Sequence, residues 1–241
     1  MAAVILQAVG VSKAFGGIRA VDDVDFDLAR GEIHALIGPN GAGKTTFVSL
    51  LSGRIASDAG QIVLGVQNIT KLPAYTRVQL GIAYTFQITS IFPGLSVFDN
   101  VALAVQSKGT RDLVDEVSLA LQRVGLTDHN AQIAKTLSYG HQRLLELAMG
   151  LALKPQVLIL DEPTQGLAAG EIAAFAALIR TLVPRTTVLL IEHNMEVVMD
   201  LADRITVLNH GKVLARGTPA EIRANTAVQT AYLGGGEDAA A

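Results

Sequence analysis

Two stretches near the start of the chain alternate hydrophobic and polar residues, and such alternation indicates strands with one buried face. They are AVILQAVGVSKAF, residues 3–15, and VDDVDFDLARGE, residues 21–32. Both contain turn-forming residues, so the pattern predicts an antiparallel pair of strands near the edge of a sheet.

Further along, the hydrophobic runs are short and unbroken, which is typical of strands buried on both faces in a parallel sheet. These runs are IHALIG at 33–38, VLIL at 157–160 and TVLLI at 187–191. Strands are also expected within GQIVLGVQNIT at 60–70 and IAYTFQ at 82–87. The segment RITVLNHGKVLARG predicts a hairpin about Asn209, His210 and Gly211.

Helical spacing dominates the middle of the chain, where Val114, Val117, Leu121 and Val124 recur at intervals of three and four. A second apolar face follows at residues 144–152, and the helical run GEIAAFAALIRTL separates two of the buried strands. We therefore expect one α/β domain over residues 1–241, with a helical subdomain inserted at approximately 88–152.

Composition narrows the class of protein. Half of the 241 residues are hydrophobic, which is enough for a sizeable core. The formal net charge of −3 and the lack of any Lys/Arg block argue against nucleic acid as a partner.

There is no cysteine, which excludes disulfides and thiolate metal sites. No window approaches 18 uncharged apolar residues, and the start lacks a basic segment, so neither a membrane span nor a secretory signal is expected.

The most specific motif is GPNGAGKTT, which fits the phosphate-binding pattern G-x-x-x-x-G-K-[ST] between a predicted strand and a predicted helix. Its glycines let backbone N–H groups approach phosphate oxygens, and the helix N-terminus adds partial positive charge. Lys44 is expected to reach the outer phosphates, and the Thr45 hydroxyl to bind Mg²⁺. The alternative is a plain glycine-rich turn. The candidate nucleotide-binding residues are Gly38, Pro39, Asn40, Gly41, Ala42, Gly43, Lys44, Thr45 and Thr46.

Two acids end the strand VLIL. Asp161 is expected at the edge of the sheet, beside the phosphate-binding residues, where it can bind Mg²⁺ directly or through water. Glu162 comes next, points elsewhere and is a candidate general base for an attacking water. The alternative is that both acids cap the helix that begins near Gly170.

Upstream of these acids, LSYGHQ at residues 137–142 precedes an apolar helix, and Ser138 is its expected N-cap. An exposed helix N-terminus with Ser138 and Gly140 is itself an anion site. One chain does not need two phosphate sites for one nucleotide, whereas two chains that face each other do. Each would offer this turn to the γ-phosphate held by the other.

Together these motifs resemble the ATP-binding subunits of ABC transporters over essentially the whole chain. GPNGAGKTT is similar to the Walker A motif of that family and VLILDEP to its Walker B motif. LSYGHQ resembles the signature motif LSGGQ, with Ser138 and Gly140 matching and Tyr139 and His141 departing. The branched-chain amino acid branch of the family often has Tyr at that position. The resemblance implies a P-loop, RecA-like parallel sheet core, an N-terminal antiparallel β subdomain and a helical subdomain.

Smaller elements extend the resemblance. Phe15 is similar to the aromatic residue that stacks on adenine, Gln87 to the glutamine that senses Mg²⁺ and the membrane partner, and His193 to the switch histidine that contacts the γ-phosphate. The alternatives are a core Phe, a solvated loop residue and a structural His. Ala168 departs from the family, which usually has a polar residue there, and this departure predicts weaker communication between the two sites of a dimer.

The function that the resemblance implies is ATP hydrolysis coupled to import, with ATP and Mg²⁺ as cofactors. Glu162, His193 and Gln87 are the implied catalytic residues, and Thr45, Gln87 and Asp161 the implied metal-binding residues. Implied partners are integral membrane permease subunits, a second copy or a paralogous ATPase subunit in a dimer, and indirectly a periplasmic or extracellular solute-binding protein. Such a subunit sits peripherally on the cytoplasmic face of the cell membrane.

The C-terminal segment GTPAEIRANTAVQTAYLG and LSYGHQR are similar to subunits that power importers of branched-chain amino acids. The implied solutes are branched-chain or other hydrophobic amino acids, or related amides and urea. Alternatives are a lipid or lipopolysaccharide exporter and a soluble ABC ATPase without a transport role. The permease is expected to dock between Gln87 and the helical lobe, at Ile91, Phe92, Leu95 and Phe98; for Phe92 and Phe98 the alternative is lobe core.

Overall fold

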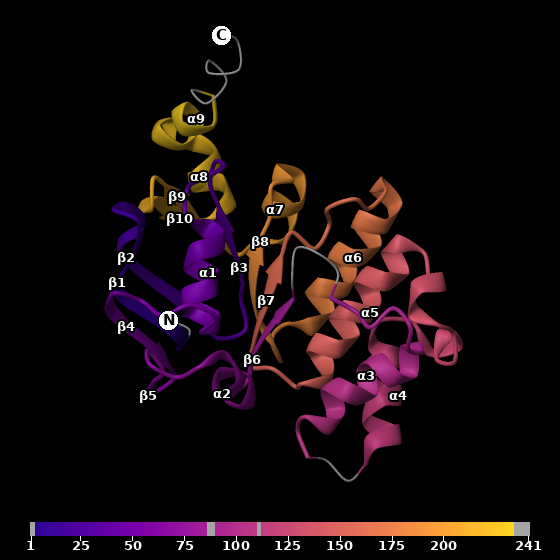
Figure 1. Cartoon of the computed structure of the whole chain (residues 1–241). Helices are drawn as coiled ribbons and strands as arrows, with labels where there is room; N and C mark the ends of the chain where they lie inside the picture. Colours follow the sequence, from indigo (N-terminus) through magenta and orange to yellow (C-terminus); the bar gives the residue numbers. More distant parts are fainter. Residues whose placement is uncertain (1–2, 86–89, 110–111, 234–241) are drawn as a thin grey trace.

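The computed structural model describes residues 3–85, 90–109 and 112–233. Gln87 and the C-terminal tail from residue 234 therefore lie outside the described residues. No helix in the described ranges is both long and apolar enough to cross a membrane. Figure 1 shows the chain coloured from its indigo N-terminal strands to its yellow C-terminal helices.

The predicted antiparallel pair is confirmed. Among the described residues, a four-stranded antiparallel sheet has the order β2-β1-β4-β5. Its strands are β1 (Val4–Phe15), β2 (Ile18–Ala29), β4 (Ala59–Leu64) and β5 (Gln67–Asn68). Buried residues such as Ile5, Val24 and Phe26 give this sheet one apolar face. That face packs into the same core as helix α1 (Lys44–Ser52).

A second sheet has the order β10-β9-β3-β8-β7-β6 within the described ranges. The strands are β3 (Ile33–Ile37), β6 (Ile82–Thr85), β7 (Val157–Asp161), β8 (Thr187–Ile191), β9 (Arg204–Asn209) and β10 (Lys212–Gly217). Neighbours from β9 to β6 are parallel, and β10 returns antiparallel to β9 as the predicted hairpin. The carboxyl ends of β3, β7 and β8 therefore meet at one edge, where ligands of α/β proteins bind.

The helices cover both sides of this sheet and form a lobe beside it (Figure 1). They are α1 (Lys44–Ser52), α2 (Ala74–Gln79), α3 (Val97–Gln106), α4 (Leu113–Arg123), α5 (Tyr139–Ala152), α6 (Ala169–Leu182), α7 (Met195–Leu201), α8 (Pro219–Ala224) and α9 (Thr226–Leu233). Two 3-10 helices, Thr127–His129 and Ala134–Thr136, connect α4 to α5.

Helices α3, α4 and α5 lie between β6 and β7 in the chain and pack on one another. The bounds of a helical subdomain at 88–152 stay a prediction. The expected apolar face of α4 is correct for Val117, Leu121 and Val124, which are buried. Val114 is 62% exposed instead. It stands in the first turn of α4, and periodicity does not show where a helix projects beyond its neighbours.

Arg77 anchors helix α1, which carries Lys44. Its guanidinium is 1% exposed and donates hydrogen bonds to the carbonyls of Leu50 and Leu51 at 2.7 and 2.9 Å. It also donates to the carbonyls of Thr70 and Leu72, each at 2.9 Å. Burial lowers the pKa of Arg77 to about 10, so the group stays charged at neutral pH. The last carbonyls of α1 thus gain a donor that the helix itself does not supply.

Candidate functional site

A cavity of about 430 Å³ opens at the carboxyl edge of the parallel sheet. Its walls come from four places in the sequence: β2, the turn after β3 with the start of α1, the loop after β7 and the loop after β8. The lining residues are Ala20, Asn40, Gly41, Ala42, Gly43, Lys44, Thr45, Thr46, Glu162 and His193. The sheet thus brings the glycine-rich segment together with Glu162 and His193.

The turn between β3 and α1 needs glycine at two positions. Gly43 is the N-cap of α1 with a left-handed φ of 99°, and a Cβ on it would approach the Ala20 carbonyl oxygen to 2.2 Å. A Cβ on Gly38 would come equally close, 2.2 Å, to the carbonyl oxygen of Leu208. The turn is therefore wrapped tightly against β2 and β9, which leaves no room for a Cβ at either glycine.

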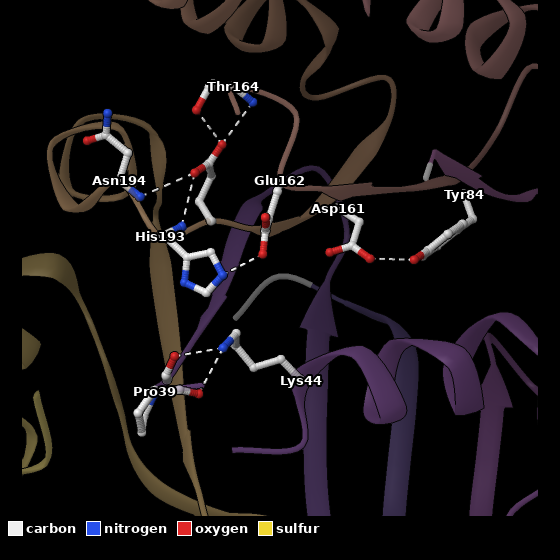
Figure 2. A network of polar contacts seen from close by, with 10 residues as sticks. Pro39, Lys44, Tyr84, Asp161, Glu162, Thr164, His193 and Asn194 are labelled. Atoms are coloured by element: carbon white, nitrogen blue, oxygen red, sulfur yellow. Dashed lines mark hydrogen bonds and ion pairs between the residues drawn. The ribbon is translucent and has the colours of Figure 1, made fainter. Parts of the chain in front are cut away.

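Lys44 is folded over this turn. Its Nζ donates to the carbonyl of Gly38 at 2.7 Å and to that of Pro39 at 3.1 Å, as Figure 2 shows. Burial lowers the pKa of Lys44, and the charges of Glu162 and Asp161 oppose that shift. The ammonium is therefore held in place at the wall of the cavity and close to both acids.

Asp161 and Glu162 diverge at the end of β7 (Figure 2). The hydroxyl of Tyr84, on the neighbouring strand β6, donates to Oδ2 of Asp161 at 2.5 Å. Burial raises the pKa of Asp161, while the hydrogen bond from Tyr84 lowers it. The guanidinium of Arg54 lies 5.0 Å from the centre of the Tyr84 ring. Asp161 is thus oriented by β6 and does not cap a helix.

Glu162 points into the cavity toward His193. Its backbone has a positive φ of 49°, which is uncommon for a residue with a side chain, and its N–H donates to the Ile191 carbonyl at 2.8 Å. The carboxylate Oε1 contacts Nε2 of His193, whose side chain is 44% exposed. Helix α6 begins only at Ala169, with Ala168 as its N-cap, so Glu162 does not cap it either. The loops after β7 and β8 therefore present an acid and an imidazole together.

The signature turn, residues 137–142, leads into helix α5, and its residues Gly140 and His141 line a different hollow. Ser138 is the N-cap of α5 as predicted, since its Oγ accepts from the backbone N–H of His141 at 3.3 Å. Gly140 is packed against Glu171: a Cβ there would approach Oε1 of Glu171 to 2.3 Å. Neither Ser138 nor Gly140 lines the cavity that holds Lys44. One chain does not bring the two predicted anion sites together.

The remaining predicted residues are placed as follows. Phe15 ends β1 and is 50% exposed, with the Nζ of Lys13 5.5 Å from its ring centre, so it is not a core residue. Phe92 and Leu95 are also exposed, at 50% and 37%. Ile91 and Phe98 pack partly against the core. The expected docking surface is thus half exposed and half lobe core.

The oxygen donors at and beside the cavity suit a hard divalent cation. Thr45 supplies a hydroxyl at the cavity wall, and Asp161, which is buried next to Glu162 and outside the lining, supplies a carboxylate. Oxygen ligands of this kind are those that Mg²⁺ prefers. No group of three or more His, Cys, Asp or Glu side chains with metal-binding geometry occurs in the part of the chain that the structure describes. Mg²⁺ bound together with a nucleotide needs only one or two protein ligands, because phosphates and water complete its shell.

Three polar residues of the site were missed by the sequence analysis. Tyr84 binds Asp161, and Glu192 and Thr164 bind each other behind His193. Only one signal in the sequence pointed to them, namely an acid immediately before His193 at the end of a buried strand. Their partners stand far away in the chain, so spacing alone does not reveal the contacts.

Comparisons with known proteins agree with this geometry. The ABC transporter family matches residues 21–165, and a family described as branched-chain amino acid ATP-binding cassette transporter matches residues 212–238. The chain is 38% identical to the high-affinity branched-chain amino acid transport ATP-binding protein LivG of Escherichia coli strain K12, over 95% of this chain and 98% of LivG. It is 36% identical to the corresponding protein BraF of Pseudomonas aeruginosa, with the same coverage, 95% and 98%.

Solved structures give the same fold. A crystal structure of the ADP conformation of an ATP-binding cassette of an ABC transporter matches with a TM-score of 0.88 and 25% identity. The match covers 96% of this chain and 99% of the solved one. The α/β architecture with its phosphate-binding turn is therefore that of ATP-binding cassettes.

Proposed function

Because the chain belongs to the ABC transporter family of ATP-binding subunits and is an ATPase of that family, we propose a transport role for it. It powers the import of branched-chain or chemically related amino acids. The observation that carries the catalytic part is the cavity in which Lys44, Glu162 and His193 face one another. The solute class is supported by the similarity to LivG and BraF and by the C-terminal family match at residues 212–238.

ATP occupies the cavity with its phosphates against the backbone N–H groups of residues 40–46. Lys44 reaches the outer phosphates, and the ring of Phe15 stacks on the adenine. Thr45 and Asp161 hold Mg²⁺, which when bound neutralises charge on the phosphate oxygens. Glu162 accepts a proton from the attacking water, and His193, in contact with Glu162, orients the γ-phosphate and the water.

A second copy of the chain, or a paralogous subunit, completes each site. Ser138 and the N-terminus of α5 are exposed in the helical lobe and do not line the cavity of their own chain. In a sandwich dimer they donate to the γ-phosphate bound by the partner. The ring of Tyr139 packs against Gly166, where a Cβ would approach it to 2.9 Å, so the signature turn is coupled to the loop that follows Glu162. The weaker communication expected from Ala168 stays a prediction.

The Tyr84→Phe variant tests the assignment of Asp161. We expect the Mg²⁺ concentration for half-maximal ATP hydrolysis to rise by roughly tenfold, because partners that orient a metal ligand affect metal affinity to that extent. Binding of a fluorescent ATP analogue in EDTA should not change, since Tyr84 does not line the nucleotide cavity. An unchanged Mg²⁺ dependence would show that Asp161 does not need Tyr84 for this role.

A hollow beside the helical lobe is the proposed docking place of the permease. It measures about 350 Å³, and its wall includes Tyr84, Ser90, Phe92, Leu103 and Met149. Phe92 and Leu103 are 50% and 41% exposed, so an apolar surface is available to a helix of the membrane partner. Tyr84 lines this hollow and also binds Asp161, which connects the docking place to the nucleotide site. The subunit then works peripherally at the cytoplasmic face of the membrane.

The transport assignment is tested by purification of tagged Glu162→Gln with Mg-ATP from detergent-solubilised membranes of the native host. We expect a multi-span permease to be recovered, and loss of the gene to abolish uptake of labelled leucine, isoleucine or valine. Complementation with the wild type, but not with Glu162→Gln, should restore uptake. Recovery of ribosomes or DNA-repair proteins without a permease would reject transport while leaving the ATPase assignment in place.

A further inference from the structure

A buried carboxylate connects the two loops that carry Glu162 and His193. Glu192 is 4% exposed and directly follows β8. Its Oε1 accepts hydrogen bonds from the backbone N–H of Thr164 at 3.0 Å and from the Thr164 hydroxyl at 2.5 Å. Its Oε2 accepts from the backbone N–H groups of His193 at 3.0 Å and Asn194 at 3.3 Å. Figure 2 shows Thr164 on one side of this network and His193 and Asn194 on the other.

Each oxygen of Glu192 thus serves one loop. The Thr164 side belongs to the segment that begins with Glu162, and the other side is the turn that leads from β8 into α7. Thr164 is itself 5% exposed, so water does not readily replace these bonds. Buried donors without an acceptor carry a desolvation penalty, and this penalty favours keeping both loops on the one carboxylate.

We propose that Glu192 is a positioning residue, which sets the separation of Glu162 and His193 without touching the nucleotide. Glu162 also donates its backbone N–H to Ile191, the residue before Glu192, at 2.8 Å. The two loops are therefore joined at two points, the backbone carbonyl of Ile191 and the carboxylate of Glu192. These two points fix the loops that carry Glu162 and His193, whose side chains contact each other. This inference rests on the catalytic roles proposed above for Glu162 and His193.

The Glu192→Gln variant separates positioning from binding. A carboxamide keeps the shape but has one acceptor oxygen, so its NH₂ group must face the donors of one of the two loops. We expect kcat for ATP hydrolysis to fall roughly tenfold or more, because small displacements of reacting groups are costly. The Kd for a fluorescent ATP analogue should stay within about twofold, since Glu192 does not line the cavity.

A double-mutant cycle with His193→Ala shows whether Glu192 acts through His193. If it does, His193→Ala lowers kcat strongly in the wild type but only slightly in the Glu192→Gln background. Fully additive losses would overturn the proposal. If His193→Ala alone leaves kcat unchanged, the catalytic role proposed for His193 fails, and the two failures are therefore distinguishable.

A second pair of variants covers the case in which Glu192→Gln does not fold. Thr164→Val removes the hydroxyl donor at constant shape and should lower kcat, whereas Thr164→Ser keeps the hydroxyl and should remain close to wild type. Equal kcat values for the two variants would contradict the proposal. The matched control is Glu32→Gln, because Glu32 also accepts from a backbone N–H, that of Ala29 at 2.8 Å, but lies outside the site. Its kcat should not change.

Discussion

Glu162→Gln is expected to bind Mg-ATP with the affinity of the wild type and to hydrolyse it about 10²–10⁴-fold more slowly, the usual contribution of a general base. The carboxylate of Glu162 lines the cavity and contacts Nε2 of His193, whereas Asp161 is turned toward Tyr84. Gln keeps the size of the side chain but does not accept a proton. The variant should therefore stop before hydrolysis, with ATP enclosed.

The measurement combines phosphate release with size-exclusion chromatography in ATP. The variant should elute as a closed dimer that persists, while the wild type returns to monomers after hydrolysis. Glu116→Gln is the matched control, because that carboxylate pairs with Lys154 in the helical lobe and lies away from the cavity. Undiminished turnover in Glu162→Gln would remove Glu162 from the role of base.

Lys44→Ala should weaken ATP binding by about 10–100-fold, the loss expected for a hydrogen bond between charged groups. The ammonium is the positive side chain that lines the cavity, and the structure already holds it against the carbonyls of Gly38 and Pro39. Because Lys44 is expected to reach the outer phosphates, ADP binding should be affected less than ATP binding.

Titration with fluorescent ATP and ADP analogues checks this expectation, with the thermal midpoint of unfolding as a test of the fold. Lys71→Ala is the control. Lys71 is exposed in the turn before α2, so this substitution removes the same charge at a place away from the cavity. Equal losses of ATP and ADP affinity would show that Lys44 contacts the inner phosphates instead.

Strong local patterns in the sequence predicted much of the fold. The alternation at 3–15 and 21–32 predicted the antiparallel strands β1 and β2, and unbroken aliphatic runs predicted β3, β7 and β8. The helices α2, α7, α8 and α9 were not predicted. Each spans eight residues or fewer, which is too short for a 3.6-residue period to repeat clearly.

In the candidate site, too, residues with local spacing were predicted, whereas contacts between distant residues were not. The glycine-rich turn, Lys44 and Asp161 were predicted as site residues because their spacing is local and matches the pattern expected for phosphate and Mg²⁺ binding. The alternative that Asp161 and Glu162 cap α6 is wrong, because Tyr84 and His193 hold them instead. Local spacing left the cap open as an alternative, whereas the parallel order of β6, β7 and β8 favours contacts between strand ends.

The sequence by itself determined the class of chemistry, since the motif at 38–46 and the acids after β7 need only neighbours in the chain to be recognised. Only the tertiary structure decided how those groups are aimed. Arg77 donates to the last carbonyls of α1, and Tyr84 donates to Asp161 and so orients it. Glu192 accepts from both loops that carry Glu162 and His193. The bonds of Arg77 to Leu50, of Tyr84 to Asp161 and of Thr164 to Glu192 join residues far apart in the chain. For Tyr84 and Glu192 the geometry follows from which strands are neighbours in the sheet, a property that no local pattern encodes.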